Sequence, residues 1–315
     1  MDLRRFALRH SGEYLCLTVN LLDSTSLHFL TKSLTLLENS MASSSQVLKM
    51  TFEATPYFVS PTSVSRSKVW IVLPAYNEAE NLGDLIQSIS RSMRVAQLDY
   101  EIVIVDDGSR DGTRDVAQSY LPHASLTILV HTENQGLGAT MRDCFDYVAK
   151  KAQPTDFVVA MDADNTHNPA LIKSMISCLE EGNDVVIASR YERGSQIKGV
   201  PAFRQWLSLM ASFLFRICFP VRGVKDYTCG YRAYRVQLIQ EAFAKYGTGF
   251  INQNGFECMV DILIKLRKMD ALFRELPLVL RYDFKKGESK MRVARTILRS
   301  LALIAKYRLA PQQAS

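Results

Sequence analysis

The sequence has no paired-cysteine motif. Its six cysteines are scattered over 315 residues without a C-x-x-C pair or a Cys/His spacing of the zinc type, which excludes a zinc ribbon and a small disulfide scaffold. We interpret them as reduced thiols, several of them in the core, and therefore expect a cytoplasmic location. They are Cys16, Cys144, Cys178, Cys218, Cys229 and Cys258.

Long hydrophobic runs are also missing. No stretch reaches the roughly 18 consecutive apolar residues that a membrane-spanning helix needs. Residues 206–221, interrupted by Arg216, and residues 297–309 are typical of helices that lie on a membrane surface, although a core-packed helix fits the first equally well. We therefore expect peripheral contact with the cytoplasmic face of a membrane, made directly or through a membrane-bound partner subunit.

Two common nucleotide-binding motifs are absent. The sequence contains no G-x-x-x-x-G-K-[ST] loop and no G-x-G-x-x-G turn after its first predicted strand. The net charge of +6 suits a polyanionic partner, but no segment interleaves clustered Lys and Arg with aromatics, so nucleic acid is not a predicted partner. A hydrophobic content of 47% excludes disorder of the whole chain.

What the sequence does contain is a regular alternation of strands and helices. Residues 1–65 are rich in Ser, Thr and Leu without sustained periodicity, and we predict a poorly ordered extension. Residues 66–291 alternate buried strands with amphipathic helices, which predicts an α/β fold with a mostly parallel sheet covered by helices on both faces. Residues 292–315 are predicted to form an amphipathic helix and a tail.

Polar clusters follow the predicted strands. "PAYNE", "VDDGS", "MDAD" and "ASRY" each end a strand, and ligands of parallel sheets bind outside these carboxyl ends. Turns and helix caps explain any one cluster, but four at a single edge favour a site. Asp162 and Asp164 are hard oxygen ligands, so this edge is predicted to hold Mg²⁺ or Mn²⁺ on a diphosphate.

A family resemblance rests on several motifs in order. "LPAYNEAENL", "IVIVDDGSRDGT", "NQGLGAT", "MDADNTH" and "ASRY" resemble the glycosyltransferase family two pattern, which implies a GT-A type, Rossmann-like fold. "GVKDYTCGYRAYR" and "KKGESKM" are similar to motifs of the polyprenol-phosphate sugar transferases. The resemblance covers residues 69–291 and leaves the N-terminal extension outside.

The resemblance implies a role for individual residues. A group of nucleotide-binding residues would line the base and the ribose. A pair of metal-binding residues would hold the ion on the diphosphate of a nucleotide-sugar donor such as GDP-mannose or a UDP-sugar. Further residues would contact the phosphates, the sugar and the acceptor. The nucleotide group is Pro74, Tyr76, Glu78, Val105 and Asp107, with Ala163 between the metal pair Asp162 and Asp164, and the remaining catalytic residues are Arg190, Asp226, Arg232 and Lys290.

The chain departs from the family pattern at two positions. Thr166 stands where some members have a glutamine that serves as a further metal ligand. Phe284 stands where others have an arginine, and Lys285 and Lys286 follow it directly; they supply charge without the fork geometry of arginine. His167, close to the aspartate pair, is expected to support it from behind rather than to bind the metal.

The resemblance implies inverting, metal-dependent transfer of a hexose to a polyprenyl or dolichyl phosphate. A phosphate nucleophile is already largely deprotonated at neutral pH, so the chemistry needs cations rather than a strong base. Two alternatives stay open. A saccharide or other lipid acceptor would need a base such as Asp226, and a non-catalytic protein would bind the nucleotide sugar without turnover.

Overall fold

The computed structural model describes residues 2–10, 13–21, 67–286 and 293–309, with side chains for 67–286 and 296–308. Residues 1–63 and 64–315 form two compact units. In the first unit, strands β1 (Asp2–His10) and β2 (Glu13–Leu21) pair antiparallel as a hairpin. They fall within the segment predicted to be poorly ordered, most of which lies outside the described residues.

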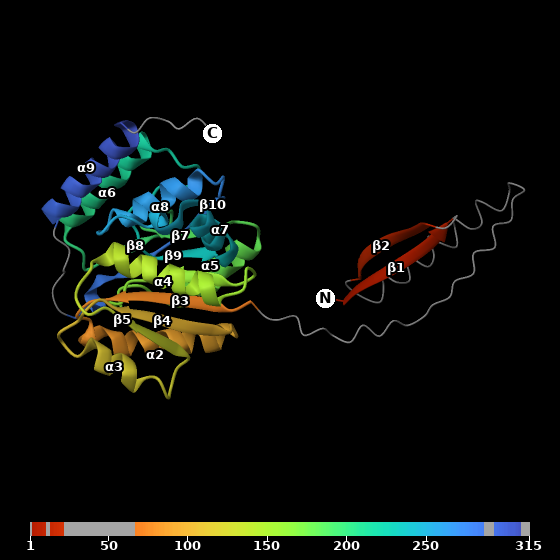
Figure 1. Ribbon diagram of the computed structural model, residues 1–315, viewed down its shortest axis with the longest axis horizontal. Helices are drawn as coiled ribbons and strands as arrows, with labels where there is room; N and C mark the ends of the chain where they lie inside the picture. The colour runs from red at the N-terminus through yellow and green to blue at the C-terminus, as the bar shows by residue number, and fades with distance from the viewer. Residues whose placement is uncertain (1, 11–12, 22–66, 287–292, 310–315) are drawn as a thin grey trace, which may run out of the picture. The chain divides into compact units, whose positions relative to one another are not determined.

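The second unit contains a seven-stranded sheet in the order β10-β7-β9-β6-β3-β4-β5 (Figure 1). Strand β9 runs antiparallel to both of its neighbours, and the other pairs are parallel. The predicted mostly parallel sheet is therefore confirmed. The strands are β3 (Val69–Ala75), β4 (Tyr100–Asp106), β5 (Leu126–Val130), β6 (Phe157–Ala160), β7 (Val185–Ser189), β9 (Arg232–Arg235) and β10 (Phe273–Pro277).

Helices cover both faces of this sheet. Figure 1 shows α2 and α3 on one side of β3 and β4 and α4 on the other. The helices are α2 (Ala79–Ala96), α3 (Thr113–Ser119), α4 (Leu137–Lys151), α5 (Leu171–Glu180), α6 (Ala202–Cys218), α7 (Val236–Tyr246), α8 (Cys258–Arg267) and α9 (Val293–Leu309). Two 3₁₀ turns, η1 (Gly247–Phe250) and η2 (Tyr282–Phe284), and a small parallel sheet of β8 (Gln196–Lys198) and β11 (Val279–Arg281) complete the unit.

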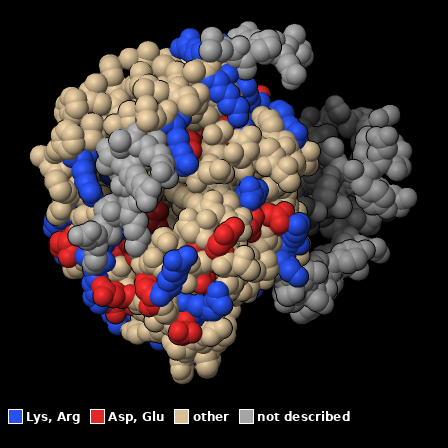
Figure 2. Space-filling model, turned by 60° about the vertical axis from the view of Figure 1, so that its left-hand side comes forward, with Lys and Arg blue, Asp and Glu red and all other residues tan. Residues whose placement is uncertain are grey.

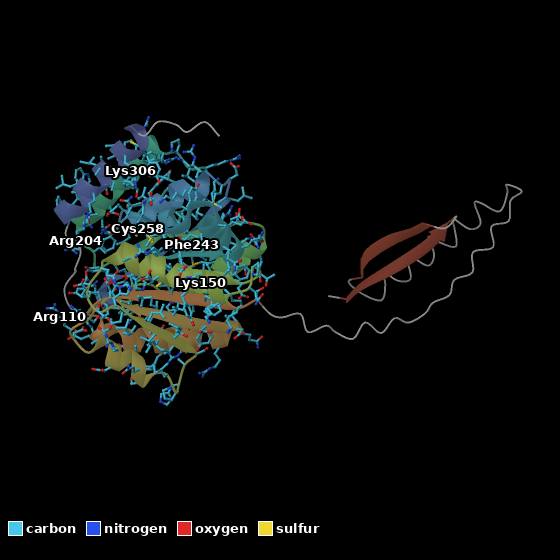
Figure 3. The ribbon with its side chains drawn as sticks, in the orientation of Figure 1. Arg110, Lys150, Arg204, Phe243, Cys258 and Lys306 are labelled. Carbon is cyan, nitrogen blue, oxygen red and sulfur yellow. The ribbon has the colours of Figure 1, made fainter. Side chains whose placement is uncertain are left out.

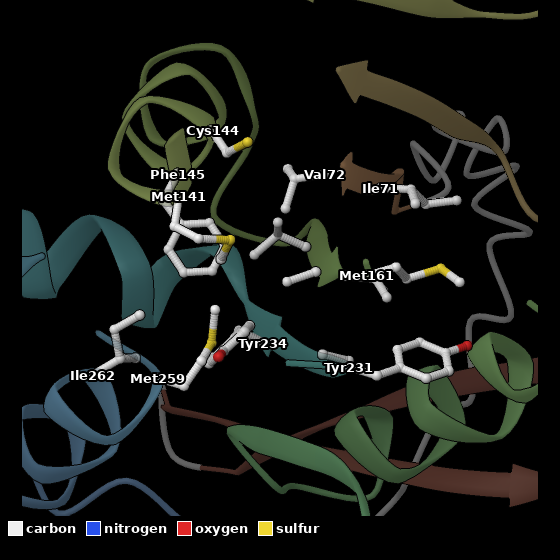
Figure 4. Packing of buried hydrophobic residues seen from close by; sticks show 14 of the residues in the cluster. Ile71, Val72, Met141, Cys144, Phe145, Met161, Tyr231, Tyr234, Met259 and Ile262 are labelled. Atoms are coloured by element: carbon white, nitrogen blue, oxygen red, sulfur yellow. The ribbon is translucent and has the colours of Figure 1, made fainter. Parts of the chain in front are cut away.

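The core is continuous across the antiparallel strand. The apolar runs of β3, β4, β6 and β7 are buried, as expected for strands covered on both faces. In Figure 4, Met141 and Phe145 of α4 approach Tyr234 of β9 and Met259 of α8. The rings of Phe145 and Tyr234 pack edge to face with centroids 5.3 Å apart. Strand β9 thus belongs to the same core as the strands predicted from the sequence.

None of the helices in the described part of the chain combines the length and the apolar character needed to cross a bilayer.

Arg232 lies inside this core, although the family resemblance implied a place near the sugar and the acceptor. The residue is fully buried on β9. Its guanidinium donates to the backbone carbonyls of Met259, at 2.7 Å, and Tyr227, at 2.8 Å. The arginine therefore joins β9 to α8 and to the segment before β9. Its role near the sugar and the acceptor stays a prediction, and its burial is a feature that the motif does not reveal.

A buried polar cluster holds the glycine-rich loop between β5 and α4. Asp107 accepts hydrogen bonds from the backbone N–H groups of Gln135, at 2.8 Å, and Gly136, at 2.9 Å. It also pairs with His131 Nδ1 at 2.7 Å, and His131 Nε2 contacts Asp143 at 2.8 Å. The carboxylate of Asp107 thus positions this loop, and its predicted place in the nucleotide pocket stays a prediction.

His131 carries a shifted pKa. Burial lowers the pKa of His131, but the hydrogen bonds and charges of Asp107 and Asp143 outweigh this effect and raise it above its ordinary value. The protonated ring therefore stabilises the folded chain fully below the unfolded pKa of about 6.5, and this contribution is lost as the pH rises through the raised value.

Replacing Arg232 tests its structural role. Arg232→Met should lower the free energy of unfolding by about 2–4 kcal/mol, because two buried carbonyls lose their donors. The measurement is urea unfolding followed by circular dichroism. Arg235→Met is the matched control, since Arg235 also donates to backbone carbonyls but is partly exposed on the same strand. Equal losses for the two variants would contradict the assignment.

The His131 cluster predicts a pH-dependent stability. The free energy of unfolding of the wild type should exceed that of His131→Gln most at about pH 6, and the difference should shrink towards about pH 9 as the imidazolium deprotonates. Denaturant titrations at a series of pH values provide the test. A difference that is constant over this range would show that the ring is not charged in the folded chain.

Candidate active site

The polar strand ends meet at one edge of the sheet. The parallel strands β3, β4, β6 and β7 all end there, so the predicted clusters become neighbours. The loops after β3 and β4 are tied together, because the N–H of Asn77 donates to Ser109 Oγ at 2.8 Å and the N–H of Arg110 donates to Asn77 Oδ1 at 2.8 Å. Figure 3 labels Arg110 at the outer rim of this edge.

Asp162 and Asp164 follow strand β6. Their side chains are 39% and 13% exposed, so Asp162 is the more open of the two. Gly230 leaves space beside the Asp162 carboxylate, since a Cβ added at this glycine would lie 3.1 Å from Asp162 Oδ1. The predicted pair is thus presented at the sheet edge, against the segment that leads into β9.

Two side chains hold Asp164 in place. Thr166 Oγ1 donates to Asp164 Oδ1 at 2.7 Å, and Lys285 Nζ donates to Oδ2 at 2.6 Å. The hydroxyl of Thr166 therefore orients the carboxylate from behind. Lys285 was noted only as a replacement charge and was left out of the predicted catalytic residues; its signal was a lysine displaced by one position from the family arginine.

The charges of the pair are unequal. Although 39% of its side chain is exposed, the surrounding protein partly desolvates the Asp162 carboxylate and raises its pKa; the neighbouring Asp164 and Glu78 add to this effect, while His167 and Lys285 oppose it. Burial also acts to raise the pKa of Asp164, but Lys285, His167 and Thr166 outweigh it and lower the pKa. The ionised form is therefore stabilised more at Asp164 than at Asp162.

These residues fit a divalent ion shared with a diphosphate. Within 67–286 and 293–309, no group of three or more His, Cys, Asp and Glu side chains could hold a metal. Two hard carboxylate oxygens would suit Mg²⁺ or Mn²⁺, which commonly take their remaining ligands from water and substrate phosphates. The pair would therefore depend on the substrate to complete the coordination.

His167 supports the backbone of the pair. Its Nδ1 accepts the N–H of Asp162 at 3.3 Å, and its Nε2 lies 3.9 Å from Asp162 Oδ2. The ring is buried and stacks on Tyr231, with centroids 4.9 Å apart. This geometry fits the supporting position expected for His167.

Arg190 and Asp226 form a second charged group after strand β7. Arg190 Nε and Nη2 donate to the two oxygens of Asp226 at 2.8 and 2.7 Å, and Nη2 also donates to Thr228 Oγ1 at 2.6 Å. Burial raises the pKa of the fully buried Asp226, but Arg190 and backbone N–H groups lower it overall. Asp226 therefore stays ionised and holds the arginine, whose side chain is 17% exposed.

The hydroxyl groups beside this pair lead to helix α6. Thr228 Oγ1 lies 3.3 Å from Ser208 Oγ on that helix. Ser208 also accepts a hydrogen bond from the hydroxyl of Tyr191, at 3.1 Å, and the Arg190 guanidinium lies over the Tyr191 ring. A cation and three hydroxyl groups are thus gathered next to α6.

The residues predicted to bind the nucleotide differ in their exposure. Pro74 and Tyr76 are partly exposed at the sheet edge, and Glu78 is nearly buried, with Oε2 accepting from Asn81 Nδ2 at 2.8 Å. The side chains of Val105 and Ala163 are buried, so the structure does not present them to an open pocket. The predicted Lys290 lies outside the described residues.

Lys285 and Lys286, the last residues described before Lys290, each contact a distant part of the chain. The backbone N–H of Lys286 donates to Asn81 Oδ1 at 2.9 Å, and its carbonyl accepts from Asn81 Nδ2 at 3.1 Å. The pairing brings Lys286 beside α2, although Asn81 lies 205 residues earlier in the chain. Its neighbour Lys285 contacts Asp164, which lies 121 residues earlier. No spacing rule in the sequence indicates this contact.

Comparison with solved structures confirms the GT-A type fold. Glucosyl-3-phosphoglycerate synthase from Mycobacterium tuberculosis, in complex with Mn²⁺, UDP-glucose and phosphoglyceric acid, aligns with a TM-score of 0.58 and 19% identity over 79% of this chain and 82% of that chain. Mannosyl-3-phosphoglycerate synthase from Rubrobacter xylanophilus aligns with a TM-score of 0.52 and 20% identity over 79% and 77%. At these identities the likeness concerns the fold.

Sequence comparison identifies the family. The dolichol-phosphate mannosyltransferase of Pyrococcus furiosus is 32% identical over 77% of this chain, which spans 63% of that relative's length. The polyprenol monophosphomannose synthase of Mycolicibacterium smegmatis is 30% identical over 66% of this chain and 73% of the relative. The model of the family described as "Glycosyl transferase family 2" matches residues 70–243. With its fold, its aspartate pair and these relatives, the chain belongs to glycosyl transferase family 2.

Proposed function

We propose that the chain transfers a hexose from a nucleotide-diphosphate sugar to a polyprenyl or dolichyl phosphate, with inversion at the anomeric carbon. The observation that carries the proposal is a chain of contacts: the segment before β9 contacts Asp162 through Gly230 and binds Arg190 through Thr228, and Thr228 in turn contacts Ser208 on the exposed apolar helix α6. The names of the two relatives, a dolichol-phosphate and a polyprenol transferase, support the same acceptor class.

The donor would bind at the aspartate pair. Asp162 and Asp164 would hold Mg²⁺ or Mn²⁺, which would supply positive charge to the diphosphate. The diphosphate leaves with the electron pair of the broken sugar–oxygen bond. Lys285 already lies at this pair and supplies a cation from the chain itself. Pro74 and Tyr76, partly exposed at the same edge, would face the nucleoside.

The acceptor phosphate would bind at the Arg190 cluster. Arg190 is a fixed cation because Asp226 holds its guanidinium on one side, and the hydroxyls of Ser208 and Thr228 are potential donors to phosphate oxygens. A phosphate monoester has a second pKa near about 6, so its oxygen attacks the anomeric carbon without prior proton removal. The cluster needs to position this anion and to offset its repulsion from the diphosphate.

This arrangement favours a phosphate over a hydroxyl acceptor. A saccharide hydroxyl would need a general base, and Asp226 was the candidate for that role. The structure buries Asp226 against Arg190, which lowers its pKa and makes it a poor proton acceptor. A phosphate acceptor requires no such base.

The lipid chain would lie on an apolar face formed by helices α6 and α9, which lie side by side in Figure 1 and are in contact. Figure 2 turns this part of the molecule forward and shows a broad upper area with few charged side chains. Such a face suits the interface of a bilayer, and we propose peripheral attachment to the cytoplasmic side. Its exposed residues are Phe203, Trp206, Leu209, Met210, Phe213, Leu214, Ile217, Ile297, Leu298 and Leu301.

Turnover is the direct test of the proposed function. The full chain with Mn²⁺ or Mg²⁺ should form a lipid-linked sugar from one member of a panel of GDP- and UDP-sugars and a polyprenyl phosphate. Asp164→Ala should lower the rate by about 100-fold or more, because the leaving diphosphate loses its cation. Asp99→Ala, an exposed aspartate in the loop between α2 and β4, should leave the rate unchanged.

Three results would contradict parts of this proposal. Full turnover by Asp164→Ala would remove the metal assignment. Transfer to a saccharide and not to the lipid phosphate would replace the acceptor. Binding of the nucleotide sugar with no transfer to any acceptor would favour a non-catalytic protein.

Liposome flotation tests the apolar face. The wild type should float with anionic liposomes, whereas Phe213→Asp combined with Leu298→Asp should bind at least about tenfold more weakly, since each change removes roughly 1.5–3 kcal/mol of apolar burial. Val95→Asp is the matched control, because Val95 is 79% exposed as a single apolar residue on α2. Equal flotation of the double variant and the control would show that this face does not contact the membrane.

A further inference from the structure

Residues 281–286, at the end of strand β11 and after it, lie against the loop that carries the aspartate pair. The backbone N–H of Arg281 donates to the carbonyl of Thr166 at 3.0 Å, two residues after Asp164. Further along the segment, Lys285 Nζ donates to Asp164 Oδ2 at 2.6 Å. The segment and the loop are therefore joined through the backbone and also through a pair of charged side chains.

The backbone of this segment is held at its far end as well. Lys286 makes two backbone hydrogen bonds with the carboxamide of Asn81, at 2.9 and 3.1 Å. Asn81 is only 3% exposed, and its Nδ2 also donates to Glu78 Oε2 at 2.8 Å. The N–H of Lys285 donates to the carbonyl of Tyr282 at 3.3 Å. With its backbone fixed in this way, Lys285 can still move its flexible side chain.

The ion pair of Lys285 and Asp164 is shielded from solvent. The two side chains are only 9% and 13% exposed. The other carboxylate oxygen, Oδ1, accepts the hydroxyl of Thr166 at 2.7 Å and its N–H at 3.2 Å. Both oxygens of Asp164 are thus engaged within the chain. A pair with so little exposure is screened by salt much less than a surface pair, so its charges act on each other strongly.

Lys285 lies on the carboxylate that a divalent ion would need. An ion held by both aspartates requires an oxygen of Asp164, and the ammonium group already binds one of them. The neutral hydroxyl of Thr166 is compatible with a bound ion. An ammonium group and a divalent ion at one carboxylate, in contrast, repel each other strongly at such short range. The two cations therefore place conflicting demands on Asp164.

We propose that Lys285 is a resident counter-ion of Asp164 and that its ammonium group leaves the carboxylate when a divalent ion binds together with the donor diphosphate. The diphosphate offers the released ammonium new anionic oxygens, whereas an ion that binds alone offers it none. Lys285 is thereby a positioning residue that makes binding of the ion depend on binding of the donor. The inference rests on the proposed function, because the ion and the diphosphate belong to the proposed donor site.

Ion binding without turnover tests this displacement. Titration calorimetry on the full chain would measure the affinity for Mn²⁺ alone and in the presence of GDP or UDP. Lys285→Met should bind Mn²⁺ alone about tenfold more tightly than the wild type, because no ammonium group has to leave Asp164. The gain in Mn²⁺ affinity on adding the recognised diphosphate should be about tenfold smaller in this variant than in the wild type.

Lys286→Met is the matched control for this measurement. The Lys286 ammonium pairs with Asp84 at 3.0 Å, and the two side chains are 56% and 57% exposed. The control should match the wild type with and without the diphosphate. A wild type that binds neither Mn²⁺ nor a diphosphate overturns the proposed function and this inference together. A wild type that binds both, with unchanged values in Lys285→Met, overturns this inference alone.

Chemical labelling separates displacement from simple repulsion. A Lys285 side chain that stayed in place and only repelled the ion would also weaken Mn²⁺ binding. Reductive methylation of the wild type, followed by mass spectrometry, should modify Lys285 at least about threefold faster in saturating Mg²⁺ than without it, because the released amine becomes accessible to the reagent. Lys286 should react equally in both conditions.

Equal labelling of Lys285 in both conditions would overturn the displacement, whatever the Mn²⁺ affinity of the variant. This measurement uses the wild type, so it tests the inference even if thermal unfolding shows that Lys285→Met is not folded.

Discussion

The arrangement of the site follows from two carboxylates at the end of a buried strand. Asp162 and Asp164 follow β6, where both side chains are partly exposed. One cation, Lys285, and one hydroxyl group, that of Thr166, donate hydrogen bonds to Asp164. Asp162 has less compensating charge from the chain, and in the proposed function a divalent ion and the substrate would supply it. The neighbouring polar groups are organised around this imbalance.

The antiparallel strand β9 connects the two charged groups. It enters the sheet between β6 and β7, which separates their carboxyl ends by one strand. The segment leading into it contacts both, because Asp226 and Thr228 bind Arg190 while Gly230 lies against Asp162. Arg232 then secures the strand to α8 from within the core. One short stretch thus contacts both the aspartate pair and the Arg190 cluster and fixes their relative position.

Residues of one chemical type have different roles here. Asp162 is presented at the surface, Asp107 is used to hold the glycine-rich loop, and Asp226 to hold an arginine. Among the arginines, Arg190 is partly exposed and Arg232 is fully buried. The motifs that carry these residues look equally polar in the sequence. Their roles separate only when burial and hydrogen-bond partners are known.

The sequence by itself determined the parallel strands, the helices that alternate with them and the aspartate pair, because these depend on local periodicity and on the rule that ligands bind at strand ends. The family resemblance followed from motif order and is confirmed. Only the tertiary structure decided that β9 lies between β6 and β7 and that Lys285 reaches Asp164 across 121 residues. These contacts join segments far apart in the chain, and no local pattern encodes which distant partner a side chain will meet.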